Sequence, residues 1–367
     1  MQASSAVIRA GAEAPELHPL SLRPLPARPL VSVLVSNYNY GRYIAETIES
    51  VLAQTYTNFE LVICDDGSTD DSVRVIEKFT ASDPRVRLIR KANGGQSSGF
   101  NAAFARSRGE ILCLLDSDDL FLPEKVETVV AGFQAAPECG FGVHRVIKVS
   151  EQRRRQGVWP MSSSLPCGWH GERLLENGGV LAYMPPTSGL SLRRQVADRA
   201  FPLPSDRTLL CCADQMLTRF APLLTLVMKQ EEALSEYRLH DSNNYERSRL
   251  TEDSLRRELI ACDQLWSLQK QFLGAMTPEL AARFQPVDRH PYIAYLSYLL
   301  SRFAGDPEAR QYHARYMASI RGLPGARRLW FWRISIWMPR PIFTYAVNFM
   351  SRQSALKQAI ARWKGLV

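Results

Sequence analysis

The sequence predicts an α/β protein, in which a Rossmann-like, mainly parallel sheet is flanked by helices and followed by a helical C-terminal region. Two observations predict this fold class. Between residues 30 and 115, short apolar runs alternate with segments of helical period, which is the pattern of right-handed βαβ units. Beyond residue 250, the apolar residues recur at helical spacing.

Four apolar runs in the first third of the chain are predicted strands, at residues 30–36, 59–64, 86–90 and 110–115. The segments between them are predicted helices, because each has one apolar face; they are expected at 42–54, 70–80 and 96–107. Later in the chain we expect a strand at 140–149, a turn entering a strand at 183–193, and helices at 250–273, 278–284, 291–303 and 307–320.

Polar residues follow each of the four predicted strands, at 36–39, 65–66, 93–95 and 116–119. The carboxyl ends of parallel strands form the ligand crevice of open α/β folds, so these clusters are expected to face one site. The tetrad at 116–119 (DSDD) holds three carboxylates, which repel one another unless a cation neutralises them. Hard oxygen ligands suit Mg²⁺ or Mn²⁺. Taken alone, the tetrad could also be an acidic surface turn.

The chain has 367 residues and a formal net charge of +8, and the excess lies at its C-terminal end. Residues 321–367 hold nine Lys/Arg, no Asp/Glu and four of the seven tryptophans, while the remainder is close to neutral. No nucleic-acid partner is therefore expected. The basic aromatic segment is expected either to contact an anionic membrane surface or to pack on the core or on a second subunit of a homo-oligomer.

Three further features indicate a cytoplasmic protein, with peripheral contact to the inner face of the membrane as an option. Residues 1–29 lack the apolar core of a signal peptide. No apolar run reaches the roughly 20 residues that a membrane span requires. The seven cysteines include no C-x-x-C pair and are expected to be free thiols.

Two stretches resemble the nucleotide-sugar domain of family 2 glycosyltransferases with the GT-A fold. They are VSVLVSNYNYGRYIAETIESVLAQTYTNFELVICDDGSTDDS and NGGQSSGFNAAFARSRGEILCLLDSDD. The resemblance is close over about residues 30–135 and weaker at TSGLSLRR (187–194), CCADQML (211–217) and YRLHDSN (237–243). It implies inverting transfer of a sugar from a nucleoside-diphosphate sugar, most commonly a UDP-sugar, with a divalent metal on the diphosphate.

On the donor side, the resemblance implies that Tyr38 stacks on the base and that Asp66 accepts a hydrogen bond from the base imide. The alternatives are a surface tyrosine and a helix-capping aspartate. Phe100 stands where the family often has an arginine. The complete set of residues implied for the nucleoside is Ser36, Tyr38, Asp65, Asp66, Lys91, Asn93 and Gln96.

At the reacting centre, the resemblance implies that Asp118 coordinates the metal and that Asp116 binds ribose or a metal-held water. His240 would complete the metal shell or touch the diphosphate; the alternative is a structural histidine. Asp214 would be the general base, although it could also be a helix N-cap. The family usually has a glutamate immediately before this aspartate, and Ala213 replaces it here.

We expect a catalytic domain at residues 30–245, in which 30–135 bind the nucleotide sugar and 136–245 face the acceptor. A flexible tail (1–29) would precede it, and a helical region (246–320) and the basic segment (321–367) would follow. The acceptor would be a glycan or a lipid-linked acceptor, in cell-surface polysaccharide or glycolipid synthesis. Two other functions remain open: a sugar-nucleotide-binding interaction protein impaired in catalysis, and a nucleotidyltransferase. The latter would need a Gly-rich basic loop after the first strand, and residues 36–41 contain none.

Overall fold

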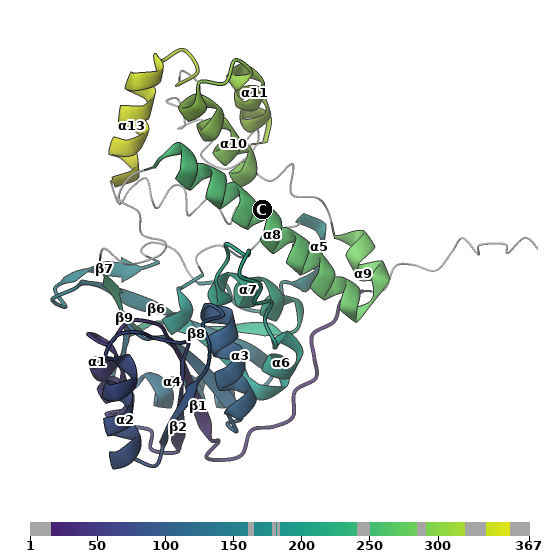
Figure 1. Cartoon of the computed structure of the whole chain (residues 1–367). Helices are drawn as coiled ribbons and strands as arrows, with labels where there is room; N and C mark the ends of the chain where they lie inside the picture. The colour runs from purple at the N-terminus through teal and green to yellow at the C-terminus, as the bar shows by residue number, and fades with distance from the viewer. Residues whose placement is uncertain are drawn as a thin grey trace, which may run out of the picture.

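The structure, a computed structural model, describes residues 16–160, 165–177, 181, 184–240, 250–284, 291–319 and 335–352. It contains a nine-stranded sheet in the order β3-β2-β1-β4-β8-β6-β9-β5, with β7 paired to β6. Helices cover both faces of this sheet, and a separate group of helices stands over one side of it (Figure 1). The α/β architecture predicted from the sequence is confirmed.

The N-terminal half of the sheet is parallel. Strand β1 (Val31–Asn37) pairs with β2 (Phe59–Asp65) on one side and with β4 (Ile111–Asp116) on the other, and β2 pairs with β3 (Val86–Arg90). In this register Ser36 lies beside Asp116 on the neighbouring strand. The polar residues at the strand ends therefore meet at one edge of the sheet, as the sequence predicts.

Alternation of side chains along these strands divides the core into two layers. Val33 and Val35 face the layer under helices α1 (Ile44–Leu52), α2 (Ser72–Ser82) and α4 (Lys125–Ala135). Leu34 faces the opposite layer, which contains Phe100 of α3 (Gln96–Arg106). All three strand side chains are fully buried, because helices cover the sheet on both sides.

The second half of the domain extends the sheet with antiparallel pairs. Strand β8 lies between β4 and β6 and pairs antiparallel with both. Strands β6 and β9 pair in parallel. The remaining elements are β5 (Leu120–Phe121), β6 (Cys139–Ser150), β7 (Arg155–Trp159), β8 (Leu190–Arg193), β9 (Leu226–Leu239), α5 (Gly171–Asn177), α6 (Arg194–Ala200), α7 (Ala213–Phe220), and the 3₁₀ turns Thr187–Gly189 and Ala221–Leu223.

Strand β9 is absent from the sequence prediction. Its pairing with β6 shifts register three times, so the apolar residues do not keep a strict period of two. Glu231 and Glu232, in the middle of the strand, are exposed. The irregular ladder therefore conceals a 14-residue strand whose C-terminal end enters the site.

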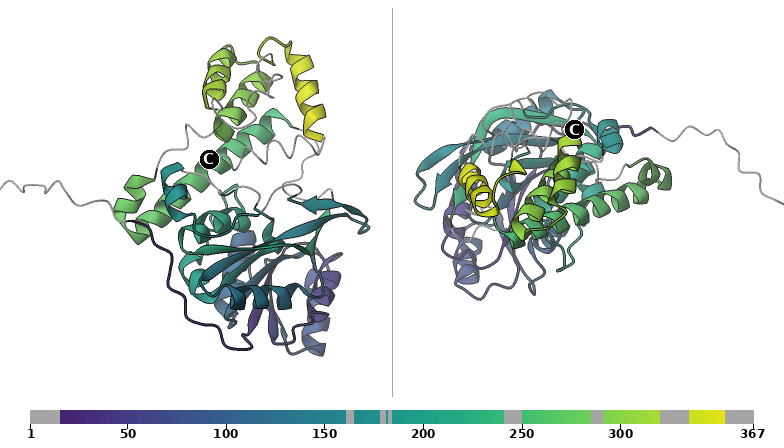
Figure 2. Two further views of the ribbon diagram at one scale, coloured as in Figure 1. Left: turned by 180° about the vertical axis from the view of Figure 1, so that it is seen from behind. Right: turned by 90° about the horizontal axis from the view of Figure 1, so that it is seen from above.

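The helical region consists of α8 (Glu252–Met276), α9 (Pro278–Arg283), α10 (Pro291–Ala304), α11 (Ala309–Ser319) and α13 (Arg340–Arg352). Helix α8 joins two cores: Leu255 packs in the helical cluster, whereas Leu265 and Leu273 pack in the core of the α/β domain. The Phe272 ring stacks on Phe220 of α7 with centroids 4.5 Å apart. Figures 1 and 2 show α8 running across the top of the α/β domain.

The expected boundary at residue 321 does not separate two packing units. Phe343 and Val347 of α13 are buried in the same cluster as Tyr298 of α10. Trp330, Trp332 and Trp363 lie outside the described residues. Among the helices described, none combines the length and the apolar character that crossing a lipid bilayer requires.

The expected flexible tail is wrong for residues 16–29. Leu17 is buried against the α/β core, and the Leu20 amide donates a 2.7 Å hydrogen bond to the Leu224 carbonyl. The Arg193 guanidinium, also buried, donates to the carbonyl of Arg23. These contacts hold the segment along the domain. Residues 16–29 are rich in proline and leucine and show neither a helical nor a strand period. The rest of the expected tail, residues 1–15, lies outside the described residues.

Candidate functional site

The aspartate tetrad leaves the end of β4 and sends its carboxylates in different directions. Asp119 points inward and is fully buried. It accepts a hydrogen bond from the Ser188 hydroxyl and one of 2.9 Å from the backbone amide of Arg238 on β9. Burial, and then the neighbouring Asp118, raise the pKa of Asp119 well above its usual range. Asp119 therefore ties the tetrad to the turn at 187–189 and to β9.

Asp118 faces His240, which lies just beyond the end of β9. Nε2 of His240 is 2.9 Å from Oδ2 of Asp118. The imidazole stacks on the Tyr43 ring with centroids 4.8 Å apart, and the edge of Tyr40 closes a second side at 5.6 Å. The Tyr43 hydroxyl donates to Glu151 at 2.7 Å. The structure thus brings Asp118 and His240 together, and two tyrosines fix the imidazole.

The Asp118–His240 pair fits part of a metal site. Two ligands in adjacent positions around a six-coordinate Mg²⁺, each at about 2.1 Å, lie about 3 Å apart. The observed 2.9 Å separation meets this requirement. Among the residues that the structure describes, no three His, Cys, Asp or Glu groups converge closely enough to hold an ion by themselves. The pair therefore suits a metal that takes its other ligands from substrate phosphates and water.

Gln96 connects Asp116 to the helix that carries Asp214. Its Nε2 donates to Oδ1 of Asp116 at 2.8 Å, and its Oε1 accepts from the backbone amide of Ala213 at 3.1 Å. Burial, followed by the charges of Asp118 and Asp214, raises the pKa of Asp116 above its usual range. The structure places Gln96 between the tetrad and α7, and its contact with a nucleoside stays a prediction.

Asp214 lies in the first turn of α7. Burial raises the pKa of Asp214 to about 6, although the Gln215 amide donates to its Oδ1 at 2.8 Å. A carboxylate with a pKa near neutrality is suited to general base catalysis, because it is largely deprotonated at neutral pH and is still basic enough to accept a proton from a hydroxyl group. Ala213, which replaces the expected glutamate, is fully buried against the core.

The Asp66 carboxylate organises the loop after β3. Lys91 donates to its Oδ1 at 2.5 Å, and the amides of Gly94 and Gly95 donate to Oδ2 at 3.0 and 2.6 Å. Gly95 has φ +88°, a left-handed conformation that favours glycine. Asp66, Lys91 and the glycine loop are therefore one unit at the start of α3, and their contact with a nucleoside stays a prediction.

Asp65 is engaged within the protein. It accepts hydrogen bonds from Asn37 at 2.8 Å and from the Ser68 hydroxyl at 2.6 Å, so it holds the turn that presents Asp66. Asn93 accepts a 2.8 Å hydrogen bond from Arg207, in a loop far along the chain. The roles predicted for Asp65 and Asn93 at the nucleoside are not tested by these contacts.

Ser36 and Tyr38 differ in accessibility. Tyr38 is 45% exposed, as a residue that stacks on an entering base would be. Ser36 lies under α3 at Gly99, where a Cβ atom would come within 2.1 Å of the Ser36 hydroxyl. Glycine at position 99 therefore permits the close approach of α3 to β1.

Sequence reasoning missed the residues that support the site. Tyr43, at the start of α1, reads as an ordinary helix residue although it stacks on His240. Arg238 is buried, donates to Glu46 at 2.9 Å and lies over the Tyr43 ring at 4.8 Å. The sequence motif at 237–240 predicts only that Arg238 adds positive charge beside His240, and its contacts with Glu46 and Tyr43 carry no sequence signal.

Comparison with known proteins assigns the family. Residues 32–195 match the model of Glycosyl transferase family 2. An uncharacterized glycosyltransferase of Nostoc sp. is 37% identical over 221 residues, which are 59% of this chain and 66% of that protein. Chondroitin synthase of Escherichia coli is 44% identical over 106 residues, 29% of this chain and 16% of the synthase. The chain thus spans less than two thirds of the length of these relatives.

Among solved structures, TarS of S. aureus in complex with UDP-GlcNAc superposes with a TM-score of 0.53, covering 90% of each chain. The sequence identity is 18%, so this likeness shows a shared fold. The matching family model, the Nostoc relative and the shared fold agree with the strand-end motifs described above. Residues 32–195 of this chain form a family 2 glycosyltransferase domain.

Proposed function

We propose that this protein transfers a sugar from a nucleoside-diphosphate sugar to an acceptor hydroxyl with inversion at the anomeric carbon. The observation that carries the proposal is the bridge made by Gln96. It connects Asp116, at the end of β4, to the first turn of α7, where Asp214 lies. A donor-side carboxylate and a base of raised pKa are thereby held at one centre.

In the proposed reaction, Asp214 takes the proton of the acceptor hydroxyl as its oxygen attacks the anomeric carbon. The bond between that carbon and the phosphate oxygen breaks on the opposite face, and the electron pair leaves with the nucleoside diphosphate. Asp118 and His240 would hold Mg²⁺ or Mn²⁺, which when bound stabilises the charge of the leaving diphosphate. The buried environment that raises the pKa of Asp214 favours proton transfer near neutral pH.

We propose a uridine donor, with the uracil on Tyr38. The fold shared with TarS, which was solved with UDP-GlcNAc, supports this choice. The exposed Tyr38 ring and the polar loop held by Asp66 lie at the ends of adjacent strands, as a base-binding wall requires. Thermal-shift titration with UDP, GDP and dTDP tests the choice, because a ligand that binds the native state raises its apparent stability.

Asp214→Asn tests the proposed mechanism. The substitution keeps the shape and removes the base, so we expect sugar transfer to fall by at least about a thousandfold while UDP binding survives. Retention of most of the activity would show that Asp214 is not the base. Release of pyrophosphate in place of a nucleoside diphosphate would favour a nucleotidyltransferase, and donor binding without turnover would favour an interaction protein.

We also propose that the protein contacts an anionic membrane surface through a C-terminal patch formed by Trp337, Ile342 and Tyr345. These side chains are 73%, 57% and 74% exposed, although the opposite face of α13 buries Phe343 in the helical cluster. Ile342 and Tyr345 lie on α13 and Trp337 lies in the turn before it. Large apolar side chains that stay exposed together are typical of interaction surfaces. The guanidinium of Arg310 lies 5.2 Å from the Trp337 ring. The excess of basic residues in 321–367 complements a negatively charged lipid surface.

A further inference from the structure

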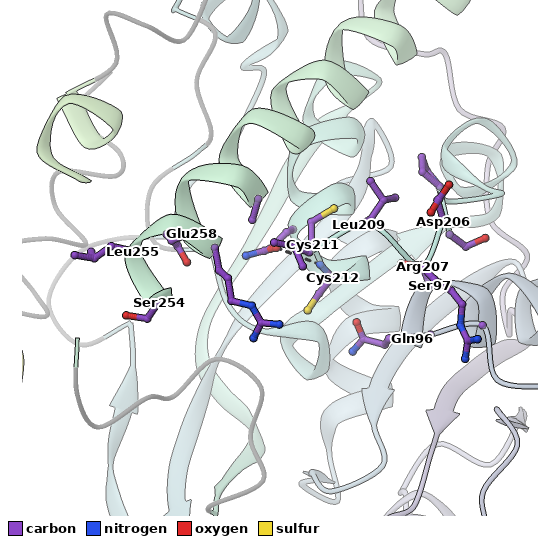
Figure 3. A pocket seen from close by; sticks show the side chains of 18 of the residues that line it. Gln96, Ser97, Asp206, Arg207, Leu209, Cys211, Cys212, Ser254, Leu255 and Glu258 are labelled. Carbon is purple, nitrogen blue, oxygen red and sulfur yellow. Dashed lines mark hydrogen bonds between the residues drawn. The ribbon is translucent and has the colours of Figure 1, made fainter. Parts of the chain in front are cut away.

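A cavity of about 700 Å³ lies between the α/β domain and the helical region. One side is formed by the loop at 93–97 and the loop at 204–212, and the other by α8 with two residues of α10. Figure 3 shows Cys211 and Cys212 between Gln96 on one side and Leu255 and Glu258 of α8 on the other. The volume lies within the range of small-molecule binding sites, about 300–1,000 Å³.

The cavity adjoins the catalytic centre. Gln96, which lines it, is also the residue whose amide contacts Asp116 and whose carbonyl oxygen receives the Ala213 amide. Cys212 and Gln215 line it as well, and they flank Asp214 in the first turn of α7. A molecule in the cavity would therefore lie beside the first turn of α7, which carries Asp214.

The wall contributed by the helical region is held in place by hydrogen bonds. Gln264 of α8 accepts from the Leu210 amide at 2.8 Å and donates to the Thr208 carbonyl at 3.0 Å. Tyr292 of α10 donates to Glu258 of α8 at 2.9 Å. These contacts connect the loop at 204–212, α8 and α10, so the cavity is a built feature and not a gap between independent parts.

We propose that this cavity binds the acceptor and that the acceptor is a glycan; the inference rests on the function proposed above. The lining mixes leucine side chains, such as Leu209 and Leu255, with hydroxyl and amide groups, such as Ser97 and Gln215. A sugar presents both C–H faces and hydroxyl edges, and this mixture matches both. A lipid tail would require an almost wholly apolar lining.

Neighbouring arginines of α8 provide a matched pair of test positions. Arg257 lines the cavity, and among the described residues no ion pair to it is present. Arg256 is also exposed but is paired with Glu252 at 2.7 Å and does not line the cavity. A tryptophan at position 257 would obstruct the cavity, whereas at position 256 it would replace an exposed side chain outside it.

The experiment compares the full-length protein with its Arg257→Trp and Arg256→Trp variants. The probe acceptors are the p-nitrophenyl β-glycosides of glucose, N-acetylglucosamine and glucuronic acid. Sugar transfer is measured by mass spectrometry. Slow hydrolysis of the donor in the absence of acceptor is measured as the amount of nucleoside diphosphate released. We expect Arg257→Trp to lower transfer at least tenfold, with the donor KM and donor hydrolysis unchanged, and Arg256→Trp to match the wild type.

Three results would overturn the inference. The first is normal transfer by Arg257→Trp. The second is a raised donor KM in that variant, which would assign the cavity to the donor. The third is an enzyme that hydrolyses the donor but accepts none of the three glycosides. Failure of the proposed function is distinguishable from these, because wild type and both variants would then release no nucleoside diphosphate from any donor.

Discussion

The side-chain amide of Gln96 donates to the carboxylate of Asp116 at 2.8 Å, so a residue outside the acidic tetrad sets the direction of its first carboxylate. The other end of the same side chain receives the Ala213 amide. The tetrad and the first turn of α7 are thus connected through one glutamine, which belongs to neither motif.

Gln96→Met tests this connection, because methionine has a similar length and cannot replace either hydrogen bond. We expect kcat to fall about 10- to 100-fold, which corresponds to about 1.4–2.7 kcal/mol of lost positioning. The Kd of UDP, measured by calorimetry, should change less than threefold. An unchanged kcat would show that Gln96 does not position the centre.

The pH dependence follows from the raised pKa of Asp214, about 6. The base acts when deprotonated, so kcat/KM should rise with pH through about 6 and then level off. Burial of this carboxylate also affects stability: the folded state holds the proton more tightly than the unfolded state, so folding stability falls as pH rises from 4 through 6. In the ligand-free protein, Asp214→Asn should therefore raise the free energy of unfolding by about 1–3 kcal/mol at pH 8. Urea denaturation at pH 4 provides the control, because the gain should vanish there.

Metal binding should depend on Asp118 and His240. We expect Asp118→Ala and His240→Ala each to weaken Mn²⁺ binding at least tenfold in the presence of UDP, because each removes one of two protein ligands. Glu151→Ala, which removes the acceptor of the Tyr43 hydroxyl and so loosens the ring beneath His240, should weaken Mn²⁺ binding less. Calorimetry measures the affinities, and EDTA should abolish transfer until Mg²⁺ or Mn²⁺ is restored. Unaltered Mn²⁺ affinity in both alanine variants would place the ion elsewhere.

Asp119 should matter for stability more than for metal binding. Asp119→Ala leaves the Ser188 hydroxyl and the Arg238 amide buried without their acceptor, which should cost about 2–4 kcal/mol in urea denaturation. Asp118→Ala, at a position nearer the surface of the site, should cost less than about 1 kcal/mol. Equal losses in the two variants would contradict the division of roles within the tetrad.

The C-terminal patch can be tested by flotation with phosphatidylcholine vesicles that contain or lack phosphatidylglycerol. The triple variant Trp337→Ser, Ile342→Ser, Tyr345→Ser should lose most of its binding to the anionic vesicles. Ile260→Ser, which removes an exposed apolar side chain from α8, is the matched control and should bind like the wild type. Equal flotation of the wild type and the triple variant would remove the membrane proposal.

Much of the fold was predictable because its signals are local. The four parallel strands are continuous apolar runs, and the polar clusters follow them directly, so Asp116, Asp118 and Asp66 could be placed at one edge of the sheet. Strand β9 was not predictable in this way, because its register shifts erase the period of two.

The supporting contacts of the site were also beyond local reasoning. Stacking of Tyr43 on His240 joins residues almost 200 positions apart, and the Gln96 bridge joins α3 to α7. The packing of residues 16–29 was not predictable for a related reason. Its partners, Leu224 and Glu172, are distant in the sequence, and residues 16–29 themselves show no helical or strand period.

Helix α8 has one further consequence, for the way in which the protein unfolds. Leu265 and Leu273 complete the core of the α/β domain, while Leu255 completes that of the helical cluster. Neither unit can lose its structure without exposing apolar surface of the other, so thermal denaturation should be a single cooperative event. For the same reason, a fragment that stops at residue 245 would present an open hydrophobic face and aggregate, although it retains every residue assigned to the reaction.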